Sequence, residues 1–441
     1  MQGLSLRRNF AWIFAGNVVY FAVQWLLIVA VARVGTPAMV GQYALALALS
    51  APVFMTVGLN LRVVRVTDVR RIWTPRQYSR LRVLSNLAAV AITLLVGVLV
   101  GLRGTAFLVL ALVALSKSTE ATSQVLYGYF QLRERLDLVS RSLLLRAALG
   151  AVGFVGVLLV TTELAAACAG LGAGWFTVYL LHDRPRYRKL LESEREAALH
   201  DGYDPDQHAS TLKALAFKAA PLGVDAGVRS LATNVPRFGV QFLLGTAALG
   251  VFTALATLAQ LVAMITGSFA DSIVGRLAKL VSKDDRSGFL RLLGLLVGFG
   301  LGVALLASAA TWLVGDFFVS LLLGSEYVNR TVLVLLMIGS GMITFQRSLS
   351  RGLQALHRYT GTLVVDCVTL GATVVLALVL IPAYGLPGAA ITLGAGFGVG
   401  SCLALVLILR SAAAMGSGGH GRPHDEGTSY GVEKASPAPT E

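Results

Sequence analysis

Several ionisable residues stand inside long apolar stretches of this 441-residue chain, where a charge is costly unless it is paired or bound. Lys117 and Glu120 are three residues apart, so in a helix they share a face and can pair with each other or line a cavity. Asp225 and Arg229 have the acid-before-base spacing of four that favours an ion pair, and Arg237 lies two turns beyond them. Such side chains can hold or compensate charge at membrane depth, and they form the candidate site.

Two further patterns bear on the same site. Asn17 and Gln24 are seven residues apart and therefore share a face of the first apolar segment. Pro221 and Pro236 flank the acid and base of the seventh segment, and prolines bend or interrupt a helix.

Nothing in the sequence indicates catalysis, a metal or a cofactor. The three cysteines lie within apolar segments at unrelated spacings: Cys168, Cys367 and Cys402. The six histidines are expected in loops or the tail: His182, His200, His208, His357, His420 and His424. The chain has no GxxxxGK[ST] phosphate-binding loop, so ATP is not an expected energy source.

The elements that must position these residues are membrane helices. The chain is 56% hydrophobic and 14% charged, with a mean hydropathy of +0.73, whereas about 25% of an ordinary soluble domain is charged. The composition predicts an all-α, multi-pass membrane protein. We expect twelve spans, at 10–32, 38–59, 83–102, 105–130, 141–161, 163–181, 213–244, 247–275, 289–310, 329–352, 361–381 and 386–410.

Orientation follows from the basic residues. With a cytoplasmic N-terminus, the inner segments hold 29 of the 37 Lys and Arg residues. The outer loops hold three: Arg33, Arg103 and Arg330. This asymmetry is the positive-inside pattern, and it predicts an even number of spans with both termini in the cytoplasm. Inner-loop arginines are then topology signals lying against anionic lipid head groups, and the net charge of +14 needs no nucleic-acid partner. The set includes Arg70, Arg71, Arg76, Arg80 and Arg82.

The chain also repeats itself. GTPAMVGQYALALALS, from Gly35, resembles GTAALGVFTALATLAQ, from Gly245. The early matches have an offset of 209: Gly41 with Gly250, Tyr43 with Phe252, and Arg82 with Arg291. Later matches, such as QLRER at 131–135 with QALHR at 354–358, have an offset of 223. A longer outer loop at 311–328 explains the change of offset.

Two halves that start on the same side form a parallel repeat about an axis along the membrane normal, as in many transporters. We expect an N-terminal six-helix half at 1–181 and a C-terminal six-helix half at 213–410. A cytoplasmic linker at 182–212 joins them, and a disordered tail follows at 411–441.

Four stretches carry a resemblance to a known family. RNFAWIFAGNVVYFAVQWLLIVAVARVGTPAMVGQYALAL resembles the opening of polysaccharide-biosynthesis membrane proteins, the O-antigen flippase-like branch of the multidrug/oligosaccharidyl-lipid/polysaccharide (MOP) exporter superfamily. The other three are FLLGTAALGVFTALATL, LLLGSEYVNRTVLVLLMIG and LVLIPAYGLPGAAITLGAG. The resemblance spans about residues 5–410.

The resemblance implies a MATE-like fold in the plasma membrane. It also implies translocation of a polyprenyl-diphosphate-linked oligosaccharide from the cytoplasmic to the outer leaflet by alternating access, for cell-surface polysaccharide biosynthesis. The implied partners are this substrate, membrane lipids, and the glycosyltransferases and polymerase of the same pathway.

A diphosphate needs a wet, cationic path across the membrane. The resemblance therefore implies that Arg229, Arg237, Lys117, Gln24 and Asn17 contact the substrate.

Ion coupling is expected at Asp225 and Glu120. Many relatives carry an acid just before the LLG of the seventh helix, where this chain has Pro236 in NVPRFGVQFLLG, so Asp225 is the better-placed substitute. Asp271 and Asp366 are expected near cytoplasmic helix ends, in contact with solvent.

Two alternatives remain. A drug or cation antiporter of the same superfamily would depend on a buried acid cluster, whereas the intramembrane excess here is basic. A membrane glycosyltransferase or polymerase would need carboxylates on a catalytic face. The outer side offers only Glu163, Asp316 and Glu326, scattered over two loops.

Overall fold

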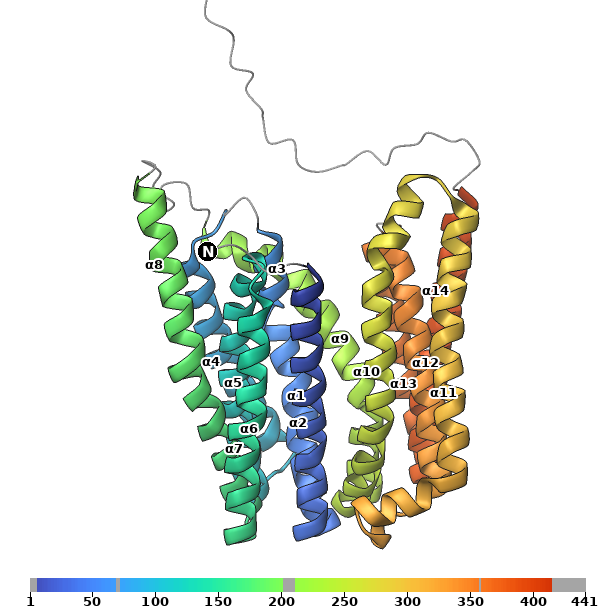
Figure 1. Ribbon diagram of the computed structural model, residues 1–441. Coiled ribbons are helices and arrows are strands. Elements are labelled where there is room, and N and C mark those ends of the chain that lie inside the picture. Colours follow the sequence, from blue (N-terminus) through green and yellow to red (C-terminus); the bar gives the residue numbers. More distant parts are fainter. Residues whose placement is uncertain (1–5, 69–71, 201–210, 357, 415–441) are drawn as a thin grey trace, which may run out of the picture.

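The computed structural model describes residues 6–68, 72–200, 211–356 and 358–414, and this part of the chain is helical without strands (Figure 1). Its elements are α1 (Leu6–Val34), α2 (Pro37–Val57), α3 (Leu61–Thr67), α4 (Pro75–Leu99), α5 (Gly104–Leu132), α6 (Leu136–Thr161), α7 (Leu164–Val178), the π-helical turn η1 (Tyr179–Asp183), α8 (Arg184–His200), α9 (Leu212–Leu244), α10 (Thr246–Ser282), α11 (Arg286–Leu322), the 3₁₀ turn η2 (Ser325–Tyr327), α12 (Arg330–Ala355), α13 (Tyr359–Tyr384) and α14 (Leu386–Ala414). The predicted all-α class is confirmed. Most of the predicted tail lies outside the described residues.

Ten stretches among the described residues are long and apolar enough to cross a membrane, so the chain is a multi-pass membrane protein. α9 is not among them, because it carries Asp225, Arg229 and Arg237 within its apolar sequence. For α10, the described side chains form an uninterrupted apolar helix over Thr246–Leu261. Both helices are nevertheless long, at 33 and 37 residues.

Local sequence sets the helix starts. Thr36 accepts a hydrogen bond from the Met39 N–H and is followed by a proline, which suits the first turn of α2. Thr74 and Gln77 form a capping box at the start of α4. Asp285 caps α11, and the backbone N–H of Gly288 lowers the pKa of its carboxyl.

Two predicted boundaries are wrong. α7 continues through η1 into α8, so His182 lies buried in a helix and not in a loop. α11 continues to Leu322 through most of the predicted 311–328 loop, because the sequence stays apolar up to its last turn. The short helix α3 was not predicted; it follows a sharp turn in which Leu59 and Asn60 adopt left-handed conformations.

The helices form two bundles, with α1, α2 and α4–α8 in the first and α10–α14 in the second (Figure 1). The same pairings recur in both. α1 packs on α6 as α9 packs on α13, α5 packs on α7 as α12 packs on α14, and α2 packs on α5 as α10 packs on α12. Since this order of contacts follows the sequence repeat, the two bundles have equivalent architecture.

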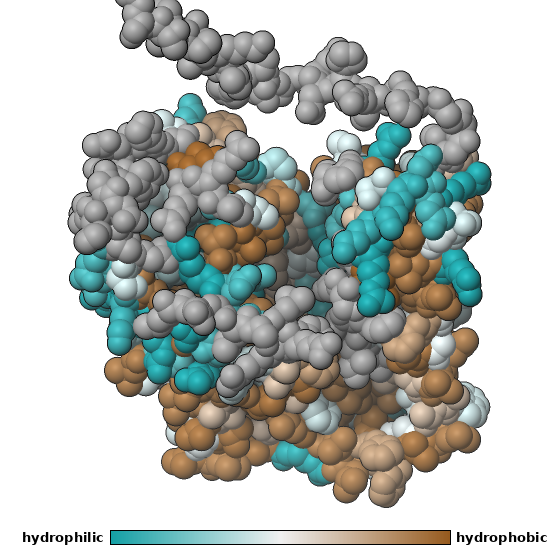
Figure 2. Space-filling view, turned by 45° about the horizontal axis from the view of Figure 1, so that its top comes forward, coloured by the Kyte–Doolittle hydropathy of each residue, from teal (hydrophilic) through white to brown (hydrophobic). Residues whose placement is uncertain are grey.

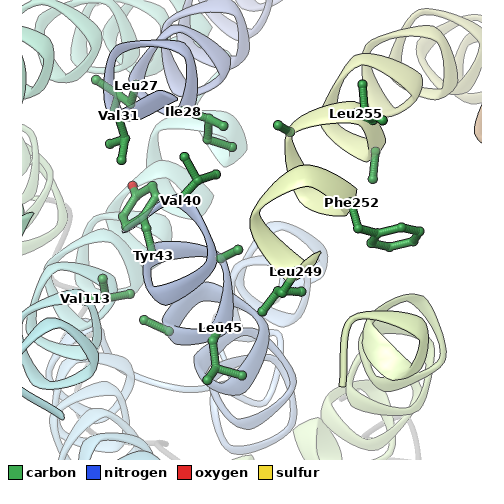
Figure 3. Packing of buried hydrophobic residues seen from close by; sticks show 14 of the residues in the cluster. Leu27, Ile28, Val31, Val40, Tyr43, Leu45, Val113, Leu249, Phe252 and Leu255 are labelled. Carbon is green, nitrogen blue, oxygen red and sulfur yellow. The ribbon is translucent and has the colours of Figure 1, made fainter. Parts of the chain in front are cut away.

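The bundles meet through α2 and α10 near the end of the molecule where these helices begin, which we call the outer end because the charge pattern predicts that it faces outward. A Cβ on Gly41 would collide with the carbonyl of Thr246, and a Cβ on Gly250 with the carbonyl of Pro37. The two contacts are equivalent in the repeat, because Gly41 corresponds to Gly250, and Pro37 to Thr246, at the offset of 209. Figure 3 shows the buried side chains around this seam, including Tyr43 of α2 and Phe252 of α10.

At the opposite, inner end the bundles have separate hydrophobic clusters. One lies in the second bundle, around Leu277, Phe289 and Leu353. The other joins α3–α5 to the start of α9, where Leu215 and Ala219 are fully buried. α9 therefore begins on the first bundle and ends on the second. Figure 2 shows the molecule hollowed between the bundles on this side, with hydrophilic side chains on the rim.

Candidate functional site

Lys117 and Glu120 form an ion pair on α5, with Nζ 2.9 Å from Oε2. The hydroxyl of Tyr20 on α1 donates to the other carboxylate oxygen at 3.3 Å, and the Lys117 ammonium lies 5.9 Å from the ring centre of Trp175. Lys117 and Glu120 were predicted either to pair with each other or to line a cavity, and in the structure they pair. The positive charge of Lys117 is therefore already compensated within α5.

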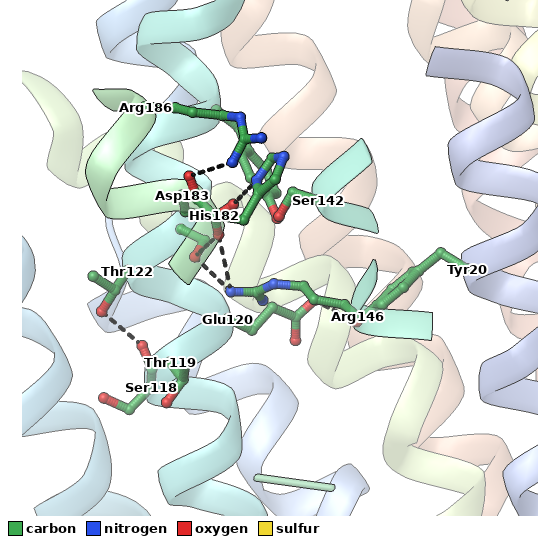
Figure 4. Close-up of polar contacts among 12 residues, drawn as sticks. Tyr20, Ser118, Thr119, Glu120, Thr122, Ser142, Arg146, His182, Asp183 and Arg186 are labelled. Carbon is green, nitrogen blue, oxygen red and sulfur yellow. Dashed lines mark hydrogen bonds and ion pairs between the residues drawn. The ribbon is translucent and has the colours of Figure 1, made fainter. Parts of the chain in front are cut away.

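A second ion pair, which the sequence did not predict, lies deeper in the first bundle (Figure 4). Arg146 of α6 and Asp183 of η1 are 1% and 0% exposed, with Nη2 3.4 Å from Oδ2. Ser123 of α5 lies between them: its hydroxyl donates to Asp183 Oδ2 at 2.6 Å and accepts from Arg146. His182 Nδ1 lies 3.0 Å from the other Asp183 oxygen.

The π-helical turn explains why this cluster was missed. Successive residues on a regular helix point about 100° apart, but both His182 and Asp183 are buried here, within the wider turn η1. By sequence, His182 is expected in a loop, and Arg146 is one of the basic residues that exceed the acids within the apolar segments. π-turns often mark functional positions, so the cluster belongs among the candidates.

Some inner arginines are also buried. Arg82, predicted to lie against lipid head groups, is 5% exposed, so that prediction is wrong for this residue. Arg65 is 3% exposed, donates to the hydroxyl of Tyr187 and is surrounded by three tyrosine rings. Arg62 donates to the side-chain carbonyl of Gln124 at 2.8 Å. Neutral partners thus hold both Arg62 and Arg65.

In the second bundle, Arg229 lies between two carboxylates. It pairs with Asp225 on its own helix, as predicted, and its Nε is 3.5 Å from Oδ2 of Asp366 on α13. Asp366 is 4% exposed and accepts from Gln346 Nε2 at 3.1 Å. The expectation that solvent contacts Asp366 is wrong, because the packing of α9 on α13 brings Arg229 to it. The side chain of Asp271 lies outside the described part of the structure.

Equivalent positions in the two bundles hold different pairs of hydrogen-bonded side chains. Ser123 bonds Arg146 in the first bundle, and Gln346 accepts from Thr369 at 3.1 Å in the second. The two pairs are related by the repeat offset of 223. The offset could have directed attention to Arg146 from the sequence alone, but it could not supply Asp183, which has no acidic equivalent.

Arg237 differs from the other predicted cations. It is 9% exposed and its Nη1 donates to the neutral Oδ1 of Asn234 at 2.9 Å. No acidic side chain among the described residues forms an ion pair with it. The residue lines a narrow pocket between α9, α10, α12 and α14 that also includes Thr233, Gln260 and Ser340. A buried guanidinium without a carboxylate retains its affinity for an anion.

Asn17 and Gln24 are half-buried on α1, the helix whose Tyr20 donates to Glu120. The Nε2 of Gln24 is buried without a hydrogen-bond partner among the described residues. α1 packs mainly on α6, whereas α9 packs on α2 and α13. No cluster of three metal-ligating side chains occurs in the described ranges.

Comparisons with known proteins agree with this architecture. No protein-family model matches the chain. It is 26% identical over 388 residues to the capsular polysaccharide biosynthesis protein CapF of Staphylococcus aureus, which covers 88% of this chain and 95% of that protein.

Solved structures with the same fold include the lipid II flippase MurJ in an inward closed conformation, with a TM-score of 0.68 and 11% identity over 91% of this chain and 89% of that one. An inward-facing multidrug resistance MATE transporter of the MOP superfamily has a TM-score of 0.63 and 13% identity, with 94% and 96% covered. A mutant of the MATE transporter VcmN of Vibrio cholerae has a TM-score of 0.62 and 12% identity, with 93% and 96% covered. The chain thus has the fold of these transporters and of the flippase, which confirms the MATE-like fold that the resemblance implied.

Proposed function

We propose that the protein is a flippase that moves a polyprenyl-diphosphate-linked oligosaccharide from the cytoplasmic to the outer leaflet for cell-surface polysaccharide biosynthesis. Twelve helices in two six-helix halves, 1–181 and 213–410, would cross the plasma membrane with both termini in the cytoplasm. The two halves would rock about their seam and expose the substrate to each side in turn. The polysaccharide-biosynthesis relative and the inner hollow support this reading.

The observation that carries the proposal is the uncompensated charge of Arg237. A diphosphate loses its hydration when it enters the membrane, and a guanidinium with free N–H groups replaces part of that hydration with charge-assisted hydrogen bonds. Arg237 is the predicted cation that has no acidic partner among the described residues, so an anion can bind it without breaking an existing ion pair. The amides of Gln24 and Asn17 would hydrogen-bond sugar hydroxyls on the opposite side of the hollow.

Lys117 and Arg229 take part only if their acids release them. Protonation of Asp225 would remove one of the two negative charges that hold Arg229, and protonation of Glu120 would do the same for Lys117. Ion coupling and substrate binding would then be linked through the same pairs, because a proton on the acid would free the base to bind the substrate anion.

The alternative is a drug or cation antiporter of the same superfamily. Asp225 and Asp366 form the kind of acidic site that an organic cation would need, but Arg229 lies between them. The flippase reading is preferred because an organic cation would first have to displace this arginine.

The test is the leaflet distribution of labelled lipid-linked oligosaccharide in cells that lack this protein. Wild type should relieve its accumulation on the cytoplasmic face, and Arg237→Gln should lower the rate of relief at least about tenfold, since loss of a buried charge contact to an anion costs several kcal/mol. Arg103→Gln, at an exposed outer arginine, is the matched control and should behave as wild type.

Thermal unfolding separates binding from folding. Arg237→Gln should not lower Tm, because it removes an unpaired buried charge, whereas Arg229→Gln should lower it by leaving two carboxylates close together. Wild-type transport by Arg237→Gln would exclude the head-group role. Unchanged lipid-linked pools combined with altered sensitivity to organic cations would favour the antiporter.

A further inference from the structure

One arginine connects the two bundles at the outer end. Arg33 is in the last turn of α1, and its guanidinium reaches the last turn of α11 in the second bundle. Nε donates to the carbonyl of Leu322 at 3.0 Å, and Nη2 donates to the carbonyls of Ser320, at 3.4 Å, and Leu321. Three backbone acceptors of one bundle are thus bonded by a side chain of the other.

These carbonyls are available because α11 ends there. The last four carbonyls of an α-helix have no partner within the helix, and the helix dipole places partial negative charge on them. Gly324 follows with a φ of 115°, which turns the chain away from the helix axis. The end of α11 is therefore an acceptor site for a cation, and Arg33 fills it.

The end of α11 is fixed to the second bundle. Val319, Leu323 and Tyr327 are buried, and α11 packs on α10 and α12 of that bundle. Asp316 forms an ion pair of 2.7 Å with Arg330 at the start of α12. The bonds from Arg33 to the carbonyls of α11 therefore connect α1 to the packed second bundle and not to a loose loop.

The charge pattern of the sequence adds an independent argument. Only three basic residues were assigned to outer loops, where the positive-inside pattern disfavours them. Two of the three, Arg33 and Arg330, hold the same segment of α11. The seam of Gly41 and Gly250 lies at the same end, so the arginines and the glycines together close the outer end.

We infer that Arg33 is a positioning residue for transport: its bonds to α11 form a latch that holds the outer end closed, and the latch must break before the outer end can open. This inference rests on the alternating access proposed above. Weakening the latch should shift the protein toward outward-open states without changing substrate contacts, because Arg33 lies at the outer end of α1 and Arg237 lies inside the second bundle.

The experiment measures the opening directly in the full-length protein in lipid nanodiscs. Spin labels at Glu163→Cys and Glu326→Cys, both exposed and one on each bundle, report the outer separation by pulsed EPR. The native Cys168, Cys367 and Cys402 are replaced by alanine. Arg33→Ala should raise the ratio of the population with the long distance to the population with the short distance about two- to fivefold. This factor corresponds to the free energy of one charge contact at a helix terminus. Arg33→Lys should restore most of the population with the short distance. Arg103→Ala is the matched control at the outer end.

The outcomes are distinguishable. If the wild type shows a second, longer distance and Arg33→Ala leaves its population unchanged, the latch is overturned and alternating access stands. A lower Tm in Arg33→Ala with no change in the distance ratio shows a merely structural contact and also overturns the latch. A single distance in both wild type and Arg33→Ala overturns the latch and alternating access together.

Discussion

At the scale of single residues, the cations within the long helices differ in how their charge is balanced. Lys117, Arg146 and Arg229 each have a carboxylate nearby, whereas Arg237 has a neutral amide. Breaking a buried ion pair costs more than the pair contributes, because the remaining charge is left without water or partner. The pairs therefore maintain the bundles, and Arg237 is free to bind an anion.

The Arg146–Asp183 pair gives a stability prediction. Asp183→Asn should lower the free energy of unfolding by about 3–5 kcal/mol, because it leaves a fully buried guanidinium without a counter-charge. Denaturant unfolding in detergent measures the change. Asp316→Asn, in the exposed pair with Arg330, should cost less than about 1 kcal/mol. Equal losses in the two variants would contradict this account of Arg146.

At the scale of elements, the close approach of α2 and α10 depends on glycine. Gly41 and Gly250 each face a backbone carbonyl of the opposite helix, so no larger residue fits without moving a helix. Symmetric contacts of this kind are expected where two repeats pack about a common axis. Small residues in such positions let membrane helices meet at short distance.

Gly41→Ala should separate α2 from α10 and destabilise the protein by about 1–3 kcal/mol, the usual cost of overpacking. Transport should fall with it, because the proposed rocking of the two halves would take place about this seam. Thermal unfolding and the leaflet assay measure the two effects. Gly298→Ala on α11, where an added Cβ meets nothing within 4 Å, is the control and should be neutral or slightly stabilising. A stable, active Gly41→Ala protein would show that the seam is not tightly packed in the membrane.

At the scale of the whole molecule, orientation and span number depend on each other. The basic residues predict inner and outer loops only if α9 and α10 both cross the membrane. The composition of α9 alone does not mark it as a span, since it carries ionisable side chains, whereas α10 runs without a charged residue from Thr246 to Ala270. Their packing places them as equivalents of α1 and α2.

Reporter fusions test this arrangement. Alkaline phosphatase, active only after export, should be active when fused after Gly245 or Gly385 and inactive after Asp284. A fluorescent protein that folds only in the cytoplasm should fluoresce at either terminus. An inactive fusion after Gly245, or an active one after Asp284, would mean that α9 or α10 does not span and that the twelve-helix topology is wrong.

The sequence by itself determined the features that depend on local chemistry and periodicity. Apolar stretches of membrane length predicted most helices, because the bilayer fixes that length. The helical spacing of Asp225 and Arg229 predicted their pair, since positions four apart meet on any helix. The repeat offsets of 209 and 223 predicted residues that occupy equivalent places in the two bundles, such as Gly41 and Gly250.

Only the tertiary structure decided which distant residues meet. Asp183 reaches Arg146, and Asp366 reaches Arg229, because particular helices pack at particular rotations, which no local spacing encodes. The bonds of Arg33 to α11 join residues almost 290 positions apart and required the bundles to be placed together. Charge balance at membrane depth is a property of these contacts, and for that reason the sequence named the cations but only the fold showed that Arg237 lies without an acid among the described residues.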